Sequence, residues 1–193
     1  MTMLIAGMVV FFGMHLVRVV APGYRARMMT SLGPWGWKAV YSLVSLVGFV
    51  LLIYGYAEIR WTSPVLWGPA PGGARMVVAL LMLPALVVFI SAYLPGRIRA
   101  LLRHPMLLAT AAWAALHLLV NGRLADLLLF GGFLAWSLVL TWASFQRPWT
   151  PSGRTPSLAW DAVAVVVGGA AWWWLAFGGG HLLLFGMPVM RIG

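Results

Sequence analysis

The sequence has no cysteine and only three acidic residues among its 193 positions. Without cysteine there is no disulfide framework, and any metal or cofactor must be held by imidazole, thioether or the acids. Those acids, Glu58, Asp126 and Asp161, have no spacing that suggests an acid–base pair. Charged residues make up 8% of the chain, against about 25% in soluble domains. This composition excludes a soluble globular protein.

The sequence instead contains several long apolar runs. Each of six runs is long enough, or nearly so, to cross a bilayer as a helix; they cover about 2–20, 37–57, 76–94, 105–120, 126–144 and 159–177. We therefore predict an all-α membrane protein, a single domain over residues 1–193 built as a bundle of six transmembrane helices. Pro84 is expected to kink the third helix. The tail 181–189 is too short to span and is expected to be interfacial or re-entrant.

The net charge of +10 comes from basic residues that lie between the apolar runs. This arrangement indicates membrane topology and anionic lipid headgroups, and we expect no nucleic-acid partner. Nine Lys and Arg residues flank the loops after the first, third and fifth runs, and four lie on the opposite side. The larger set is Arg18, Arg25, Arg27, Lys38, Arg97, Arg99, Arg103, Arg147 and Arg154, and the smaller is Arg60, Arg75, Arg123 and Arg191. The asymmetry predicts that both termini lie outside the cytoplasm.

Histidines are the main candidates for chemistry, because an imidazole among hydrocarbon needs a hydrogen bond or a metal. In the first run, Leu4, Met8, Phe11, His15 and Arg18 share one helical face. An imidazole one turn from a guanidinium suits a haem held by its iron and anchored through a propionate. The alternative is a histidine that bonds a neighbouring helix while Arg18 extends to the headgroups.

The fourth run carries a second face, on which Met106, Thr110, Trp113 and His117 align. This face could line a flat aromatic cofactor, although such a stripe also serves ordinary packing. His104 is expected at the cytoplasmic interface, where a solvated or lipid-facing histidine costs little. His181 follows three glycines at the other interface and is expected to be structural, although its depth makes His117 with His181 a competing ligand pair.

Several segments together resemble the NnrU family of integral membrane proteins. The similarity runs from about residue 3 to about 190, and the segments are 11–15, 37–46, 55–56, 103–106, 117–122 and 129–131. The resemblance implies a multi-pass protein of the bacterial inner (cytoplasmic) membrane that supports denitrification, the reduction of nitrite and nitric oxide. Its partners would then be the lipid bilayer and other membrane or periplasmic denitrification components.

The family also includes the 15-cis-zeta-carotene isomerase, a membrane enzyme with haem b held by histidines. The resemblance implies haem b here too, with His15 and His117 as iron ligands and with Arg18, Arg103 and His104 as further cofactor-binding residues. A haem-dependent polyene isomerase is the alternative function. The isomerase has a cysteine three residues before its second histidine, and Ala114 at that position counts against this activity.

Two other interpretations stay open from the sequence. One is a structural membrane subunit without a cofactor, whose histidines only pack and form hydrogen bonds. The other rests on the Arg103-His104-Pro105 segment, which is similar to a segment of the isoprenylcysteine carboxyl methyltransferases that bind S-adenosylmethionine. The remainder of their cofactor pocket, including its acidic residue, is not visible in this chain.

The predicted orientation can be tested by cysteine labelling, because the chain has no cysteine of its own. Ser152 lies in a loop predicted to be cytoplasmic. In intact cells, a single Ser152→Cys variant should not react with a membrane-impermeant maleimide. It should react once the membrane is permeabilised and the reagent reaches the cytoplasm. Labelling from the outer side of intact cells would reverse the orientation.

Overall fold

The computed structural model describes the whole chain except residues 69, 149–152, 154 and 190–193. Within the described residues the regular structure is helical, apart from one isolated bridge between Val65 and Arg123. The prediction of an all-α membrane protein is confirmed. The predictions that concern Ser152, Arg154 and Arg191 fall on residues outside the described part of the chain.

Most helices follow the apolar runs. They are α1 Thr2–Val20, α2 Pro22–Ile59, α3 Gly72–Ser91, α4 Arg97–Leu102, α5 Pro105–Val120, α6 Leu124–Asp126, the π-helical turn η1 Leu127–Gly131, α7 Gly132–Phe145, α8 Leu158–Ala176 and α9 Gly180–Phe185. Five helices are long and apolar enough to cross a membrane, with α6, η1 and α7 counted as one continuous helix of 22 residues. With 16 residues, α5 is apolar but shorter, so a count of six spans stays a prediction.

The chain forms two compact units. Unit 1 consists of Met1–Trp67 and Arg123–Gly132, and unit 2 consists of Gly68–Gly122 and Phe133–Gly193. The described tail of unit 2 contains only the short α9, as expected for a segment that does not span.

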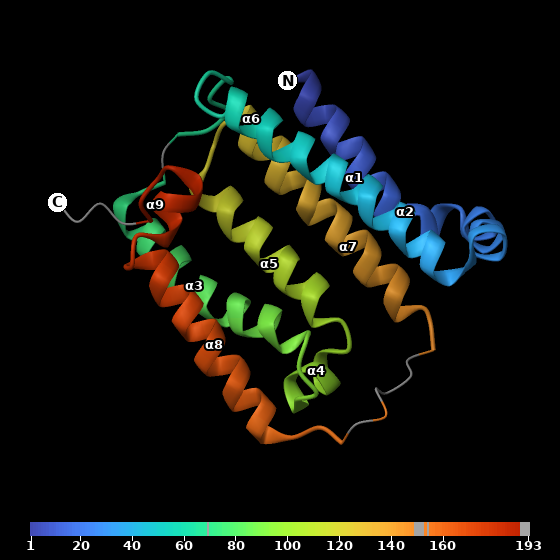
Figure 1. Cartoon of the computed structure of the whole chain (residues 1–193). Coiled ribbons are helices and arrows are strands. Elements are labelled where there is room, and N and C mark those ends of the chain that lie inside the picture. The colour runs from blue at the N-terminus through green and yellow to red at the C-terminus, as the bar shows by residue number, and fades with distance from the viewer. Residues whose placement is uncertain (69, 149–152, 154, 190–193) are drawn as a thin grey trace. The chain divides into compact units, whose positions relative to one another are not determined.

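In unit 1, α1 runs beside the second part of α2 (Figure 1). Glycines set this packing, because a Cβ atom on Gly7, Gly48 or Gly55 would lie within 3 Å of the opposing backbone. At Gly48, for example, the added carbon would be 2.7 Å from the backbone nitrogen of Phe11. Small residues that let two backbones approach closely are the usual contact between helices in lipid.

A break divides α2 at Gly33, whose φ of 70° and ψ of 168° lie outside the helical region. Pro34 follows and cannot donate the hydrogen bond that would continue the first segment. Residues 22–32 were expected to be a connecting loop, and that prediction was wrong. Their helix begins with Pro22 at its first turn, a position that proline favours.

A network of hydrogen bonds joins the C-terminal part of α2, and the loop that follows it, to the residues around α6. The Tyr56 hydroxyl donates to the buried carboxylate of Asp126 at 2.7 Å, and the second carboxylate oxygen accepts from the Arg123 backbone at 2.9 Å. The Arg123 guanidinium donates to the Ser63 carbonyl, and the Ser63 hydroxyl accepts from the Ala125 backbone. Asp126 lies in the first turn of α6, and its carboxylate helps to hold the Ser63 loop against this helix.

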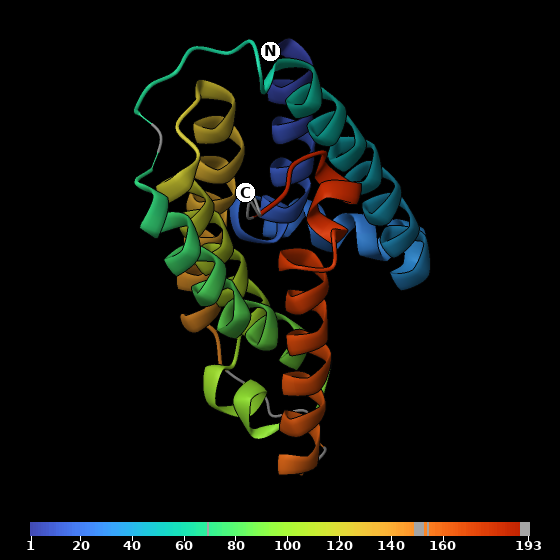
Figure 2. The same cartoon turned by 90° about the vertical axis from the view of Figure 1, so that its left-hand side faces the viewer.

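In unit 2, α3 lies between α5 and α8, as the two views agree (Figure 1, Figure 2). A Cβ atom on Gly168 of α8 would lie 2.8 Å from the Cα atom of Val87, so these helices also approach closely. The Trp172 indole donates to the Ala79 carbonyl at 2.6 Å. Pro84 lies inside α3, which continues through it as a helix, and the kink expected there stays a prediction.

The short α4 was not predicted, and Asp161 explains its position. This buried carboxylate lies in the first turn of α8, the helix-start position expected for it. Its two oxygens, however, accept from the backbone N–H groups of Arg97 and Ile98, each at 3.1 Å, and so hold the start of α4. A Cβ atom at Gly96 would collide with the same carboxylate. Asp161 thus determines where the basic residues of α4 lie.

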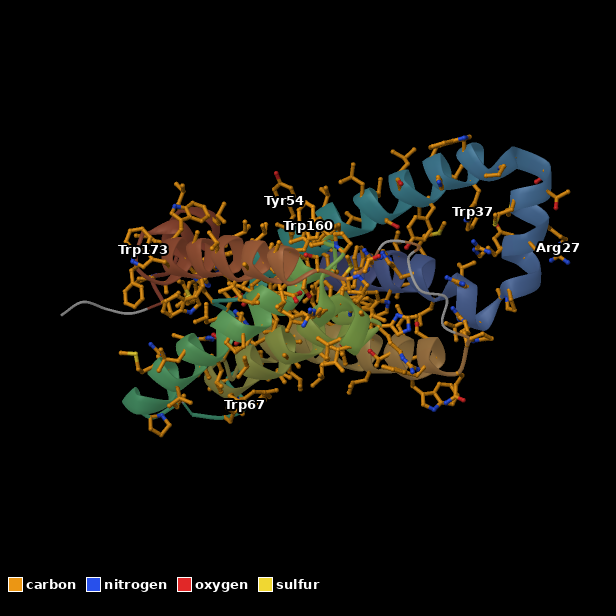
Figure 3. The ribbon with its side chains drawn as sticks, turned by 90° about the horizontal axis from the view of Figure 1, so that it is seen from below. Arg27, Trp37, Tyr54, Trp67, Trp160 and Trp173 are labelled. Carbon is orange, nitrogen blue, oxygen red and sulfur yellow. The ribbon has the colours of Figure 1, made fainter. Side chains whose placement is uncertain are left out.

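Tryptophans near the ends of membrane helices typically lie at the membrane interface. Of these, Trp61, Trp67 and Trp160 are 53%, 37% and 42% exposed, and Trp67 and Trp160 are labelled in Figure 3. Exposure of such large apolar rings fits a lipid or headgroup environment.

The α1–α2 packing can be tested at two glycines. Gly48→Ala should destabilise the protein by about 1–3 kcal/mol, because the new methyl group overpacks a backbone contact. Gly13→Ala is the matched control on α1, since an added carbon at Gly13 meets nothing within 4 Å. It should be neutral or stabilising by up to about 1 kcal/mol. Thermal unfolding in dodecyl maltoside measures both, and equal effects would contradict this account.

Candidate functional site

Two cavities contain residues that the sequence singled out, one in each unit. The cleft in unit 1 has a volume of about 280 Å³ and is lined by Met14, His15, Val17, Arg18, Arg25, Met29, Pro34, Trp37, Lys38 and Tyr41. We call it the His15 cleft. It brings together His15 and Arg18, as their shared helical face predicts.

His15 is held in one tautomer by its own helix. Its Nδ1 lies 2.7 Å from the carbonyl oxygen of Phe11, one turn earlier. A carbonyl can only accept, so Nδ1 carries the proton and Nε2 carries the lone pair of the neutral ring. The ring centroids of Phe11 and Tyr41 lie 4.3 Å and 5.3 Å from that of His15. The aromatic neighbours and the hydrogen bond together fix the orientation of the imidazole.

Sequence reasoning missed the residues that α2 adds to this cleft. Arg25 comes from the segment before Gly33, and Trp37, Lys38 and Tyr41 come from the segment after it. Trp37 is directed toward the interior of unit 1, whereas Arg27 points away from it (Figure 3). The Gly33-Pro34 pair signalled a turn, but only the folded chain shows that both segments face His15.

The cleft is lined by both basic and aromatic side chains. Arg18, Arg25 and Lys38 contribute three cations, and the Lys38 ammonium also lies 4.4 Å from the ring centroid of Trp35. Tyr24, Trp37 and Tyr41 form a series of ring contacts that leads to His15. No acidic residue lines the cleft among the residues described, so its chemistry favours an anionic group.

His117 has the same local arrangement on α5 in unit 2. Its Nδ1 lies 2.9 Å from the carbonyl oxygen of Trp113, which again leaves the lone pair on Nε2. The Trp113 ring contacts both the imidazole and Phe133, with centroids at 5.0 Å and 5.5 Å. Asn121 ends the helix by donating from its side-chain amide to the His117 carbonyl at 2.8 Å.

His181 makes the same type of hydrogen bond, but to a carbonyl six residues later in the chain. Its Nδ1 lies 2.7 Å from the carbonyl oxygen of Met187, which joins α9 to the residues that follow it. This bond fits the structural role expected for His181. In the described part of the chain, no three His, Cys, Asp or Glu residues gather into a group that could hold a bare metal ion.

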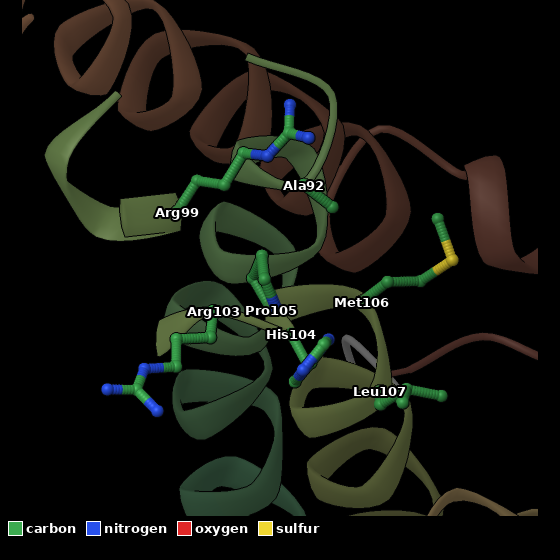
Figure 4. Close-up of a pocket in the computed structure, with 7 residues that line it drawn as sticks. All are labelled: Ala92, Arg99, Arg103, His104, Pro105, Met106 and Leu107. Atoms are coloured by element: carbon green, nitrogen blue, oxygen red, sulfur yellow. The ribbon is translucent and has the colours of Figure 1, made fainter. Parts of the chain in front are cut away.

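Arg103 and His104 belong to the second cavity, which lies in unit 2. It has a volume of about 180 Å³ and is lined by Ala92, Arg99, Arg103, His104, Pro105, Met106 and Leu107. Arg99, Arg103 and His104 are grouped around Pro105 (Figure 4). We call it the α4–α5 cavity. Arg18 and Arg103, both predicted to bind cofactor, therefore line different cavities.

The surroundings of the α4–α5 cavity change the pKa of His104. Partial burial lowers the pKa of His104, and the charges of Arg103 and Arg147 lower it further, while a hydrogen bond to the Ser144 carbonyl acts in the opposite direction. The Phe145 ring packs edge-on against the imidazole, with centroids 5.3 Å apart. His104 is therefore mainly neutral at pH 7.

A strained backbone turn carries these side chains. Arg103 has a φ of 60° and a ψ of −47°, and it is the one described residue other than glycine with a positive φ. The His104 backbone N–H donates to the Leu102 carbonyl at 2.6 Å, which closes a three-residue γ-turn around Arg103. A residue with a Cβ atom in such a conformation costs about 1–3 kcal/mol.

The strain can be measured by comparing two substitutions of Arg103. Both Arg103→Gly and Arg103→Ala remove the guanidinium, but only glycine tolerates the positive φ. The Gly variant should therefore be more stable than the Ala variant by about 1 kcal/mol. Thermal unfolding of the two proteins in the same detergent gives the difference, and an Ala variant as stable as the Gly variant would show that the turn is unstrained.

Comparison with known proteins places the chain in one family. The family model described as "NnrU protein" matches residues 3–189, nearly the whole chain. No curated protein and no solved structure matches the chain. The chain therefore belongs to the NnrU family, as the sequence segments 11–15 and 103–106 predicted.

Proposed function

We propose that this NnrU-family protein binds haem b through His15 and supports the reduction of nitrite and nitric oxide. The observation that carries the proposal is the state of His15, which lines a basic cleft and donates from Nδ1 to the Phe11 carbonyl. A histidine that ligates a metal is neutral and typically donates its other ring N–H to a carbonyl or carboxylate. His15 has this hydrogen-bonding arrangement.

The rest of the cleft suits the edge of a haem. Arg18, Arg25 and Lys38 would pair with the two propionates, as charge-assisted hydrogen bonds are strong in a partly dry site. Its volume of about 280 Å³ is near the lower end of ligand pockets, so the cleft would hold one edge of the ring system. When bound, a haem supplies one-electron chemistry and a site for small ligands such as nitric oxide.

His117 is the other proposed ligand. Its Nδ1 donates to the Trp113 carbonyl, and it lies on a face with aromatic neighbours. His104 differs, since it lies at the start of α5 and its ring contacts Ser144 and Phe145. It is therefore not proposed as an iron ligand. Because Ala114 is buried and the chain has no cysteine, a thiol cannot replace a histidine at the iron, which favours the redox role over the isomerase.

An absorption spectrum tests haem binding directly. Protein purified from cells supplied with ample haem should show a Soret band, and His15→Ala should shift it or remove it. His117→Ala should also shift the band if this second proposed ligand is correct. Absence of the band in correctly folded wild-type protein would contradict the proposal.

A matched histidine serves as the control. His181 has the same type of Nδ1 hydrogen bond but lies on the short α9, outside the His15 cleft. His181→Ala should leave the position of the Soret band unchanged. Arg25→Gln and Lys38→Gln should weaken haem retention by about tenfold each if they pair with propionates, and Arg27→Gln, which changes the same charge outside the cleft, should not.

The role in denitrification is tested in cells. A deletion strain grown anaerobically on nitrite should lose nitrite or nitric oxide reduction, and the wild-type gene should restore it whereas the His15→Ala gene should not. Normal nitrite consumption together with an accumulated cis-polyene would instead support the isomerase.

A further inference from the structure

The first part of α2, residues 22–32, is a helix that a membrane span does not need. With its 38 residues, α2 would be about 57 Å long if it were straight, whereas the hydrocarbon core of a bilayer is about 30 Å thick. The part after Gly33 has a length of about 39 Å and can cross the core on its own. Residues 22–32, which we call the 22–32 helix, are therefore left outside the hydrocarbon core.

Both ends of the 22–32 helix are held at one side of unit 1. Only Ala21 separates it from α1, and only Gly33 separates it from the later part of α2. These two neighbours are packed antiparallel, so α1 leaves the core at the side where the later part of α2 enters it. The 22–32 helix accordingly lies across the end of the pair (Figure 1, Figure 3). A helix in that place runs along the membrane surface.

Two faces of the 22–32 helix differ in character. Tyr24, Met28 and Leu32 are spaced four residues apart and share one face, on which Tyr24 and Leu32 are each 47% exposed. The ring centroids of Tyr24 and Trp37 lie 6.5 Å apart, which turns this face back toward the later part of α2. Arg27 points away from unit 1 (Figure 3). The apolar face is thus on the membrane side and Arg27 is on the water side, as in an interfacial amphipathic helix.

The polar face suits a boundary between water and lipid. Thr30 and Ser31 follow Arg27 at a spacing of three and four residues and lie on its side of the helix. Their hydroxyls donate to the helix's own carbonyls, at 3.1 Å to Ala26 and at 3.1 Å to Arg27. Neither hydroxyl needs bulk water for a hydrogen bond, so the charged group of this face is the guanidinium of Arg27.

Trp35 indicates the depth at which the helix lies. It follows the break at Gly33 and is 79% exposed, a large area for an aromatic side chain. The Lys38 ammonium lies 4.4 Å from the centroid of its ring. Indole rings of membrane proteins gather at the headgroups, where the ring is partly in lipid and the polar groups are in water. Trp35 and Lys38 therefore place the end of the 22–32 helix at the headgroup layer.

Charge identifies the lipid. The first 57 residues of the chain contain no acidic residue, and Glu58 lies at the far end of α2. The basic residues of this stretch all lie near the 22–32 helix or within it, and they are Arg18, Arg25, Arg27 and Lys38. The positive potential of this end of unit 1 attracts negatively charged headgroups. We propose that the 22–32 helix lies in the membrane interface and binds the headgroups of anionic phospholipids.

This surface is distinct from the haem site but connected to it. Arg27, Thr30 and Ser31 do not line the His15 cleft, so lipid binding does not depend on haem. The same helix nevertheless supplies Arg25 and Met29 to the cleft. Lipid bound along the 22–32 helix would therefore hold one wall of the His15 cleft in place.

Nitroxide labels on single cysteines locate the helix in the full-length protein, because the chain has no cysteine of its own. Leu32→Cys labels the apolar face and Ser31→Cys labels the polar face, both in vesicles of phosphatidylcholine and phosphatidylglycerol. The label at position 32 should meet dissolved oxygen, which concentrates in hydrocarbon, more often than the label at position 31, and a water-soluble nickel complex less often. Equal access of the nickel complex to both labels would overturn the proposal. A label at position 32 that neither reagent reaches would do so too, since a second copy of the chain would then cover the face.

A fluorophore on Thr30→Cys identifies the lipid beside Arg27. The vesicles contain both lipids, and a nitroxide quencher near the headgroup end of the acyl chain is carried first by phosphatidylglycerol and then by phosphatidylcholine. At low salt, phosphatidylglycerol should quench more strongly at the same mole fraction. The difference should shrink at high salt, because salt screens the attraction. Equal quenching by the two lipids at low salt would contradict anionic selectivity.

Charge variants in the Thr30→Cys protein decide whether the helix itself selects the lipid. Arg27→Gln should lower the preference for phosphatidylglycerol by about fivefold, which corresponds to about 1 kcal/mol for one cation at the membrane surface. Arg27→Lys should keep the preference. Arg60→Gln is the matched control, since it removes the same charge after the other end of α2, and its preference should stay within about twofold of the parent. The proposal fails if Arg27→Gln has no effect or if Arg60→Gln has the same effect.

Discussion

A helix in a bilayer has no water to satisfy its polar side chains, so each must find a partner within the protein. With only three acids in the chain, backbone carbonyls become the main acceptors. His15, His117 and His181 each bond a carbonyl through Nδ1. The same constraint therefore helps to hold the fold and directs the Nδ1 proton of each ring to a carbonyl, so that the neutral form of the ring carries its lone pair on Nε2.

The few carboxylates have a structural role for the same reason. Asp126 joins the Tyr56 hydroxyl to the start of α6, and Asp161 holds the start of α4. Each is buried and accepts two hydrogen bonds, which offsets the cost of removing a charge from water. The described residues that line the His15 cleft and the α4–α5 cavity include basic side chains and no acidic ones. The His15 cleft is therefore suited to an anionic group.

Close packing positions the residues around His15. The glycines of α1 and α2 allow the backbones to approach, and the break at Gly33 turns α2 so that residues on both sides of it line one cleft. A methyl group at Gly48 would act more than one helical turn from His15, yet it would change the spacing of the helices that hold Tyr41 beside the imidazole. Packing and ligand geometry are thus coupled in unit 1.

The sequence alone determined the fold class, the approximate bounds of most helices and the shared face of His15 and Arg18, because these depend on hydropathy and helical period within one segment. It did not determine that residues 22–32 are helical, or that α4 exists and is held by Asp161. Nor did it separate Arg103 from Arg18 into different cavities. Those features depend on contacts between residues up to 64 positions apart, such as the bond from Arg97 to Asp161, and only the tertiary structure brings such residues together.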